Sequence, residues 1–177
     1  MSFDLDQARQ ILERTPDVLR SLLENLDEEW IQANEGPDTW SPFDVVGHLI
    51  HGDQTDWIAR AERILEHGTE LAFEPFDRFA QEKASRGKTL GQLLDEFAAI
   101  RRESLEALAA LDLGPADLDR EGMHPALGKV TLRELLATWV THDLGHVAQI
   151  SRVLAKRYAG EIGPWTEYIP VVSERTG

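Results

Sequence analysis

The feature that most constrains the fold is a spacing: apolar side chains recur every three or four residues through four long segments. This spacing puts the apolar side chains on one face of an α-helix, and no strand-like alternation competes with it. Ser41, Thr89 and Thr131 stand where three of the segments begin, and all three are helix-capping residue types. We therefore expect an all-α protein, a four-helix bundle whose helices span about 5–26, 41–67, 90–111 and 131–158.

Proline and glycine punctuate these helices. Pro16 should kink the first helix, or open its second half behind a Thr15 cap, and Gly68 should end the second helix. The remaining segments are a long crossover between helices two and three, a second loop and an irregular tail, at 68–88, 114–130 and from about 160. A short helix is expected around 76–84, within the crossover. We interpret residues 1–177 as a single domain, which at this length buries about 70 % of its unfolded surface.

Composition narrows the range of partners. The formal net charge of −14 would repel nucleic acid and anionic membranes, so neither is expected as a partner. The sequence has no cysteine, which excludes disulfides, thiolate ligands and a cysteine nucleophile. No apolar run approaches the roughly 20 residues of a membrane span, and the N-terminal residues do not read as a signal peptide. We expect a cytoplasmic protein.

Polar side chains interrupt the apolar face of the last helix. The inward positions of this helix are Leu132, Leu135, Trp139, His142, His146, Gln149 and Val153. Burying a polar group without a partner costs roughly 1–3 kcal/mol, so the two imidazoles need partners. Histidines four residues apart on one helix face are spaced to bind one metal ion. The alternative, two core histidines held by hydrogen bonds, stays open.

A metal centre needs at least one more protein ligand, which in a bundle comes from a facing helix. The second helix offers His48 and His51. At 100° per residue, His48 lies on an inward flank near Val45 and Gly52, whereas His51 points further round, toward Ile58. We therefore take His48 as the third ligand.

Other polar residues are candidates for supporting roles. His67 falls at a helix C-terminus, where the helix dipole alone explains it. His124 precedes Pro125 in a loop, and is either a lid residue over the site or part of a solvated turn. The residues within sequence reach to orient the imidazoles through their other ring nitrogens are Asp44, Asp53, Asp143 and Gln149. Gln149 is preferred among them because it shares the inward face.

Two segments together resemble a known family. Trp40-Ser-Pro-Phe-Asp-Val-Val-Gly-His48-Leu, followed by Thr141-His-Asp-Leu-Gly-His146-Val-Ala-Gln-Ile, resembles the DinB/YfiT-like superfamily of proposed metal-dependent enzymes. The closing Gly163-Pro-Trp-Thr-Glu-Tyr168 is similar to the end of such domains. The resemblance implies a four-helix bundle, often a homodimer, in which three histidines hold a divalent metal. Carried onto this sequence, these are His48, His142 and His146.

The resemblance also implies a class of reaction. Relatives include S-transferases that use bacillithiol, mycothiol or glutathione, and a maleylpyruvate isomerase. Three neutral imidazoles leave a metal its full charge and open positions, as in catalytic sites. They suit zinc, nickel, iron and copper, of which we expect zinc or nickel. We expect a small-molecule substrate and transfer of a low-molecular-weight thiol. The alternatives are a metal-dependent hydrolase and a non-catalytic bundle that binds a small ligand or dimerises.

Overall fold

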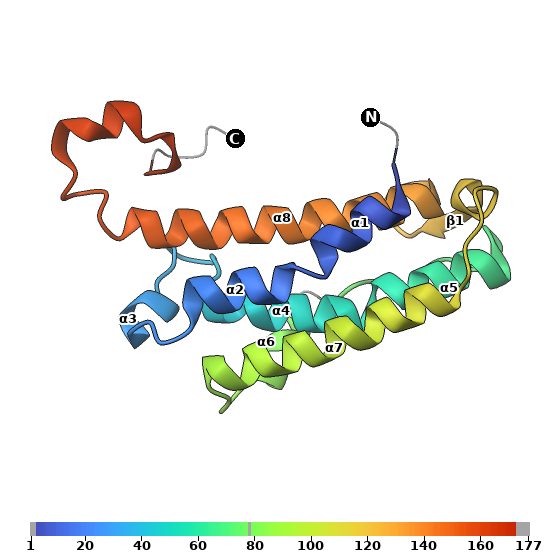
Figure 1. The fold of residues 1–177 in the computed structure, drawn as a ribbon, viewed down its shortest axis with the longest axis horizontal. Coiled ribbons are helices and arrows are strands. Elements are labelled where there is room, and N and C mark those ends of the chain that lie inside the picture. Colours follow the sequence, from blue (N-terminus) through green and yellow to red (C-terminus); the bar gives the residue numbers. More distant parts are fainter. Residues whose placement is uncertain (1–2, 78, 173–177) are drawn as a thin grey trace.

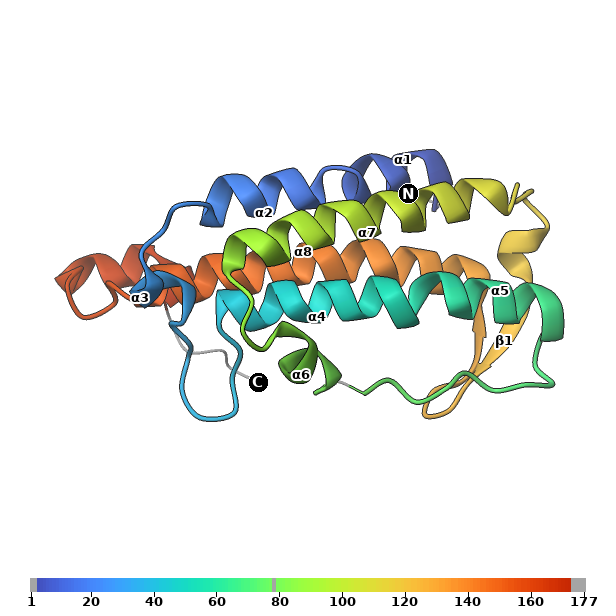
Figure 2. The same ribbon diagram turned by 90° about the horizontal axis from the view of Figure 1, so that it is seen from below.

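Four long helical rods form the bundle in the computed structural model, which describes residues 3–77 and 79–172 (Figure 1). The first rod is α1 (Leu5–Leu12) with α2 (Thr15–Leu23), the second is α4 (Pro42–Thr55) with α5 (Trp57–His67), the third is α7 (Leu90–Ala110) and the fourth is α8 (Leu132–Lys156). The second and third rods run in the same direction, because the crossover between them returns along the bundle before α7 begins (Figure 2). The predicted four-helix bundle with its long crossover is confirmed.

Shorter elements occupy the connections. The remaining elements are α3 (Glu28–Ile31), α6 (Ala80–Ser85), η1 (Asp117–Asp119), β1 (Glu121–His124), β2 (Gly128–Thr131), η2 (Gly163–Tyr168) and η3 (Pro170–Val172). Helix α6 is the short helix expected in the crossover, and it packs on α4 where Gly47 leaves room. A Cβ at Gly47 would stand 2.5 Å from Ser85 Oγ, so the Ser85 hydroxyl would have to move if a larger residue stood beside His48.

The predicted helix starts are confirmed at Ser41, Thr89 and Thr131. Each side-chain oxygen accepts a hydrogen bond from the backbone N–H three residues on, and each forms a reciprocal capping box. The first helix is also interrupted at Pro16, as predicted. The alternative in which Thr15 caps the second half does not form, because the Thr15 hydroxyl donates to the carbonyl of Ile11 in the preceding turn.

The second predicted helix is two helices. Asp56 lies between α4 and α5 with φ −113° and ψ −67°, outside the regular helical range. The Thr55 hydroxyl donates to the His51 carbonyl at 2.8 Å, a side-chain bond that often accompanies a helix bend. The regular helix of the second rod is therefore interrupted just after the turn that carries His51.

A β-hairpin replaces the loop expected at 114–130. Strands β1 and β2 pair antiparallel, with Gly122 opposite Val130. Gly122 packs against α5 and the crossover, since a Cβ there would stand 2.6 Å from Ile64 and 3.0 Å from the Phe73 ring. Phe73 also donates its backbone N–H to the Met123 carbonyl. The hairpin and the crossover thus form one wall beside α5.

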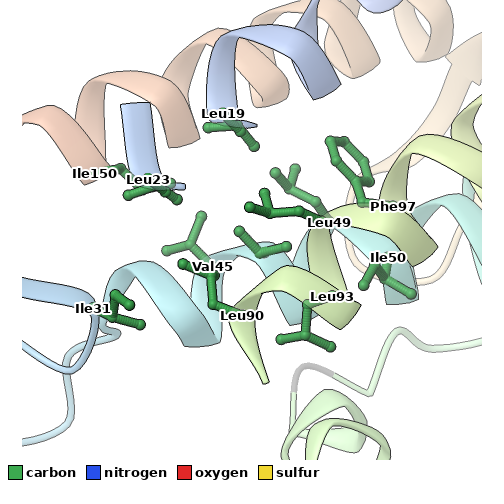
Figure 3. Packing of buried hydrophobic residues seen from close by; sticks show 12 residues of the cluster. Leu19, Leu23, Ile31, Val45, Leu49, Ile50, Leu90, Leu93, Phe97 and Ile150 are labelled. Atoms are coloured by element: carbon green, nitrogen blue, oxygen red, sulfur yellow. The ribbon is translucent and has the colours of Figure 1, made fainter. Parts of the chain in front are cut away.

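Apolar side chains from all four rods fill the interior. One cluster gathers around α4, α7 and α2, where Val45, Leu49, Leu93 and Phe97 are at most 1 % exposed (Figure 3). A second cluster lies nearer the hairpin, where Trp57 and Trp139 stack with ring centroids 5.8 Å apart. Every residue of the predicted inward face of the last helix is buried or half-buried.

A buried arginine lies among these apolar residues and ties the rods together. Arg101 in α7 is 1 % exposed. Its guanidinium donates two hydrogen bonds to Asp53 of α4, two to Asp143 of α8 and one to the Leu12 carbonyl of α1. All five N–H groups are therefore satisfied, by one helix from each of the other three rods. We did not predict this residue.

The C-terminal tail leaves its aromatic side chains in solvent. Trp165 in η2 is 66 % exposed and Tyr168 is 76 % exposed. Within the described ranges, no helix is both long enough and apolar enough to cross a membrane.

Candidate metal centre

Three histidine side chains from two rods converge on one point. Nε2 of His48, in the middle of α4, lies 3.0 Å from Nε2 of His142 in α8. Nε2 of His146 lies 3.1 Å from the same His142 atom. All three ligand atoms lie within 4.8 Å of one another, and no other such group of metal-ligating side chains occurs in residues 3–77 and 79–172.

The hydrogen bonding of His146 determines which ring nitrogen faces this point. Its Nδ1 lies 2.9 Å from Oε1 of Gln149, a carbonyl-type oxygen that only accepts, so Nδ1 carries the proton. Nε2 of His146 is then unprotonated, and its lone pair is directed at the other two imidazoles. Gln149 thus takes the orienting position for which it was preferred in the sequence.

The histidines lie in an apolar, aromatic setting. Trp40, in the connection before α4, lies with its ring 4.5 Å from that of His48, and the Trp57 ring lies 5.2 Å from that of His142. Burial lowers the pKa of His142 to about 3, helped by the neighbouring His146 and His48 charges. Burial also lowers the pKa of His146, which Gln149 and Asp143 partly oppose. The rings of His142 and His146 are therefore neutral at pH 7, as metal-binding imidazoles must be.

His51 stands outside the cluster. Its ring packs on Phe76 at 5.0 Å, and the ring of His48 contacts the same phenyl ring at 5.4 Å, but only His48 also reaches His142 and His146. The preference for His48 over His51 therefore agrees with the arrangement of the side chains. His67 is exposed at the C-terminus of α5, beside Glu66, as the helix-dipole explanation expects.

The three carboxylates considered as supports for the imidazoles have other partners. Both oxygens of Asp53 and both of Asp143 accept hydrogen bonds from Arg101. Asp44 accepts from the Ser41 backbone and hydroxyl in the capping box of α4. The expectation that these carboxylates orient the imidazoles is therefore wrong. It failed because the apolar-face pattern did not reveal Arg101, the cation that binds Asp53 and Asp143.

A cavity of about 300 Å³ opens beside His48 and His142. Helices α4, α5 and α8 form one side of it, and the crossover and the hairpin form the other. His124 lines this cavity from the end of β1, and its Nδ1 also accepts hydrogen bonds within the hairpin turn, so its role as a lid stays a prediction. Arg60 of α5 also lines the cavity, and nothing in the sequence pattern marked this residue as part of the site.

A four-helix bundle with three inward histidines and an adjoining cavity is the arrangement expected of the proposed metal-dependent enzymes of the DinB/YfiT-like type. The sequence model of the DinB superfamily matches residues 11–150, and the chain belongs to that superfamily. Among solved structures it is similar to YfiT from Bacillus subtilis, described as a probable metal-dependent hydrolase with an unusual four-helix bundle topology. The two chains are 22% identical, with a TM-score of 0.74 over 86% of this chain and 87% of that chain. No curated protein sequence matches the chain.

Proposed function

We propose that the chain is a metal-dependent enzyme whose divalent ion is held by Nε2 of His48, His142 and His146. The convergence of three ring nitrogens carries this proposal. Two imidazoles bound about 2.1 Å from one ion at the tetrahedral angle stand roughly 3.4 Å apart, close to the 3.0 and 3.1 Å separations of these atoms. The Gln149 contact with His146 supports it as well, because histidine ligands commonly donate their second ring N–H to such an acceptor.

The donor set supports a catalytic role over a purely structural one. Three protein ligands would leave a metal ion open to a further ligand, and the cavity is lined by two of these histidines, His48 and His142. A divalent ion held there would supply Lewis-acid chemistry and would lower the pKa of a coordinated thiol or water molecule. Zinc and nickel remain the metals we propose, because both accept imidazole ligands.

Thiol transfer is the reaction we put first. The sequence has no cysteine, so any sulfur nucleophile comes from outside, as a low-molecular-weight thiol. The largely apolar cavity suits an electrophilic small molecule as the second substrate. Hydrolysis is the second candidate, favoured by the description of the structurally similar YfiT as a probable metal-dependent hydrolase.

One set of measurements tests both the metal site and the reaction. Metal content is determined for the protein purified without chelator, and for His48→Ala and His51→Ala as a matched pair. We expect about one ion per chain, lost in His48→Ala and kept in His51→Ala. The metal-loaded protein is then assayed with thiol-reactive electrophiles and with esters or amides, each with and without bacillithiol, mycothiol or glutathione.

The outcomes separate the candidates. Turnover that needs both the metal and an added thiol supports transfer, whereas turnover that needs only the metal and water replaces transfer with hydrolysis. Wild-type protein that binds no metal would refute the metal-centre proposal. A metal-loaded protein without turnover in any condition leaves a non-catalytic ligand-binding bundle. The homodimer implied by the resemblance stays a prediction, which sedimentation velocity tests.

A further inference from the structure

The cavity beside the histidines has two unlike parts. Most of its wall is apolar, formed by Trp57, Phe73, Phe76, Leu127, Val130 and Leu135. Its volume of about 300 Å³ is at the lower end of the ~300–1,000 Å³ typical of small-molecule sites. The guanidinium of Arg60 and the imidazole of His124 interrupt this apolar wall. Their hydrogen-bonding state decides which ligand fits.

The guanidinium of Arg60 has donors to spare. Its Nε pairs with Oδ1 of Asp56 at 2.6 Å, and in the described part of the chain Asp56 is its only ion-pair partner. The guanidinium lies over the Phe73 ring, 5.2 Å from the centroid, and its side chain is 11% exposed. Nε is thus occupied, and the terminal nitrogens have no hydrogen-bond or ion-pair partner among residues 3–77 and 79–172, so they are available to a ligand on a largely apolar wall.

His124, which also contacts the Phe73 ring, offers a second hydrogen-bond donor. Its Nδ1 accepts the backbone N–H groups of Ala126 and Leu127, each at 3.1 Å. A ring nitrogen that accepts carries no proton, so the neutral ring carries its proton on Nε2. Its ring meets Phe73 edge-on, with centroids 6.0 Å apart. Burial and the nearby Arg60 both lower the pKa of His124, which keeps the ring in this neutral form.

The acidic groups at the cavity are already engaged. Asp56 is paired with Arg60. Glu134, which is exposed, accepts hydrogen bonds from the Thr131 backbone and hydroxyl at the start of α8. Arg60 balances the charge of Asp56. Glu134 stays ionised, but it is exposed, so water screens its repulsion of a small anion bound by Arg60.

We propose that this cavity selects small molecules with an apolar, preferably aromatic, body and a carboxylate group, which is bound by Arg60 and His124, the two side chains that contact the Phe73 ring. The terminal nitrogens of Arg60 match a carboxylate in geometry and charge, and Nε2–H of His124 adds a neutral donor. The apolar body then fills the space toward His48 and His142. As a statement about substrate this rests on the proposed function, but the binding itself does not need the metal.

Binding of benzoate and of its uncharged counterpart benzamide tests the proposal. Isothermal titration calorimetry is run on the full-length protein, metal-loaded and chelator-treated. Benzoate should bind more tightly than benzamide in both states, and Arg60→Gln should weaken benzoate binding at least about tenfold without changing benzamide binding. Arg60→Lys should keep part of the affinity. The exposed Arg102→Gln serves as the charge-matched control and should change nothing.

Two further variants sharpen the test. Asp56→Asn releases the occupied edge of Arg60 and should tighten benzoate binding, whereas the double variant Asp56→Asn/Arg60→Gln should bind as weakly as Arg60→Gln and leaves no buried unpaired charge. His124→Asn keeps a side-chain acceptor for the turn but loses the Nε2–H donor, and should weaken benzoate by a smaller factor.

Several results would overturn the proposal. They are failure of benzoate to bind the wild type, equal binding of benzoate and benzamide, and benzoate binding that needs the metal and survives Arg60→Gln. Elemental analysis of each sample keeps a missing metal, which contradicts the proposed function, distinct from a missing carboxylate preference.

Discussion

Arg101 shows how one residue reconciles a buried charge with an apolar core. Its side chain and those of Asp53 and Asp143 are at most 2% exposed, and the three carry a net charge of −1. Desolvating such a group is costly, and only the complete set of hydrogen bonds offsets that cost. The guanidinium also lies over the rings of Phe97 and Trp139, with the centroids 4.8 and 5.2 Å away.

Replacing Arg101 should therefore destabilise the protein strongly. Arg101→Met leaves two carboxylates facing each other without a cation, and we expect a loss of about 3–5 kcal/mol in the free energy of unfolding. Urea unfolding followed by far-UV circular dichroism measures it. The triple variant Asp53→Asn/Arg101→Met/Asp143→Asn removes all three charges and should recover part of the loss. Equal stability of the wild type and Arg101→Met would show that the network contributes little.

The residues predicted from sequence were those that break an expected pattern. His142, His146 and Gln149 stood out because they occupy apolar positions of a helix, and the structure brings His48 to them. Arg101 lies in a helix that the sequence already predicted from its apolar face. A charged residue in such a helix is expected to face solvent unless its partners in the fold are known. Those partners lie 48, 42 and 89 residues away in sequence, so no local spacing reveals them.

At the scale of elements, α8 contributes to both ends of the molecule. Its first turn reaches the cavity through Glu134, and its last turns hold the connection before α4. There, Arg152 makes two hydrogen bonds to Glu35 and Lys156 a third contact at 2.8 Å. Since Trp40 in the same connection covers His48, this ion cluster helps keep one side of the histidine site in place.

The Glu35 cluster should give a pH-dependent contribution to stability. Hydrogen bonding from Arg152, with a further contribution from Lys156, lowers the pKa of Glu35 from 4.5 to about 2. Because the folded-state pKa is the lower one, the stabilisation is complete above about pH 4.5 and is lost as the pH falls toward 2. Glu35→Gln should cost about 1 kcal/mol at pH 7, and the difference should shrink as the pH approaches 2. Urea unfolding of both proteins between pH 7 and pH 3 checks this, and a constant difference would contradict it.

Helix starts could be predicted from the sequence, whereas the hairpin and the break between α4 and α5 could not. Capping boxes are local, so Ser41, Thr89 and Thr131 marked three helix starts correctly. The hairpin was missed because its strands have four residues each and depend on contacts with α5 and the crossover. The break at Asp56 was missed because neither glycine nor proline marks it.

For the whole molecule, the core does not depend on the histidine site. Apolar side chains from all four rods fill it, and Leu19, Leu23, Phe97 and Trp139 are fully buried. Chelation should therefore leave the helical circular dichroism unchanged at 25 °C and lower only the melting temperature, because bound metal stabilises the folded state alone. His48→Ala should show no such shift on chelation. Loss of the helical signal on chelation would assign the metal a structural role.

The two sides of the cavity have different origins in the chain. The histidines project from α4 and α8, whereas Phe73, Phe76, His124 and Leu127 come from the crossover and the hairpin. Connecting segments tolerate substitution and changes of length far better than packed helices. One scaffold can therefore diversify: new hairpins would change which molecules are accepted while the reaction chemistry stays the same. Exchanging residues 121–131 between members of the superfamily is the engineering route that this division opens.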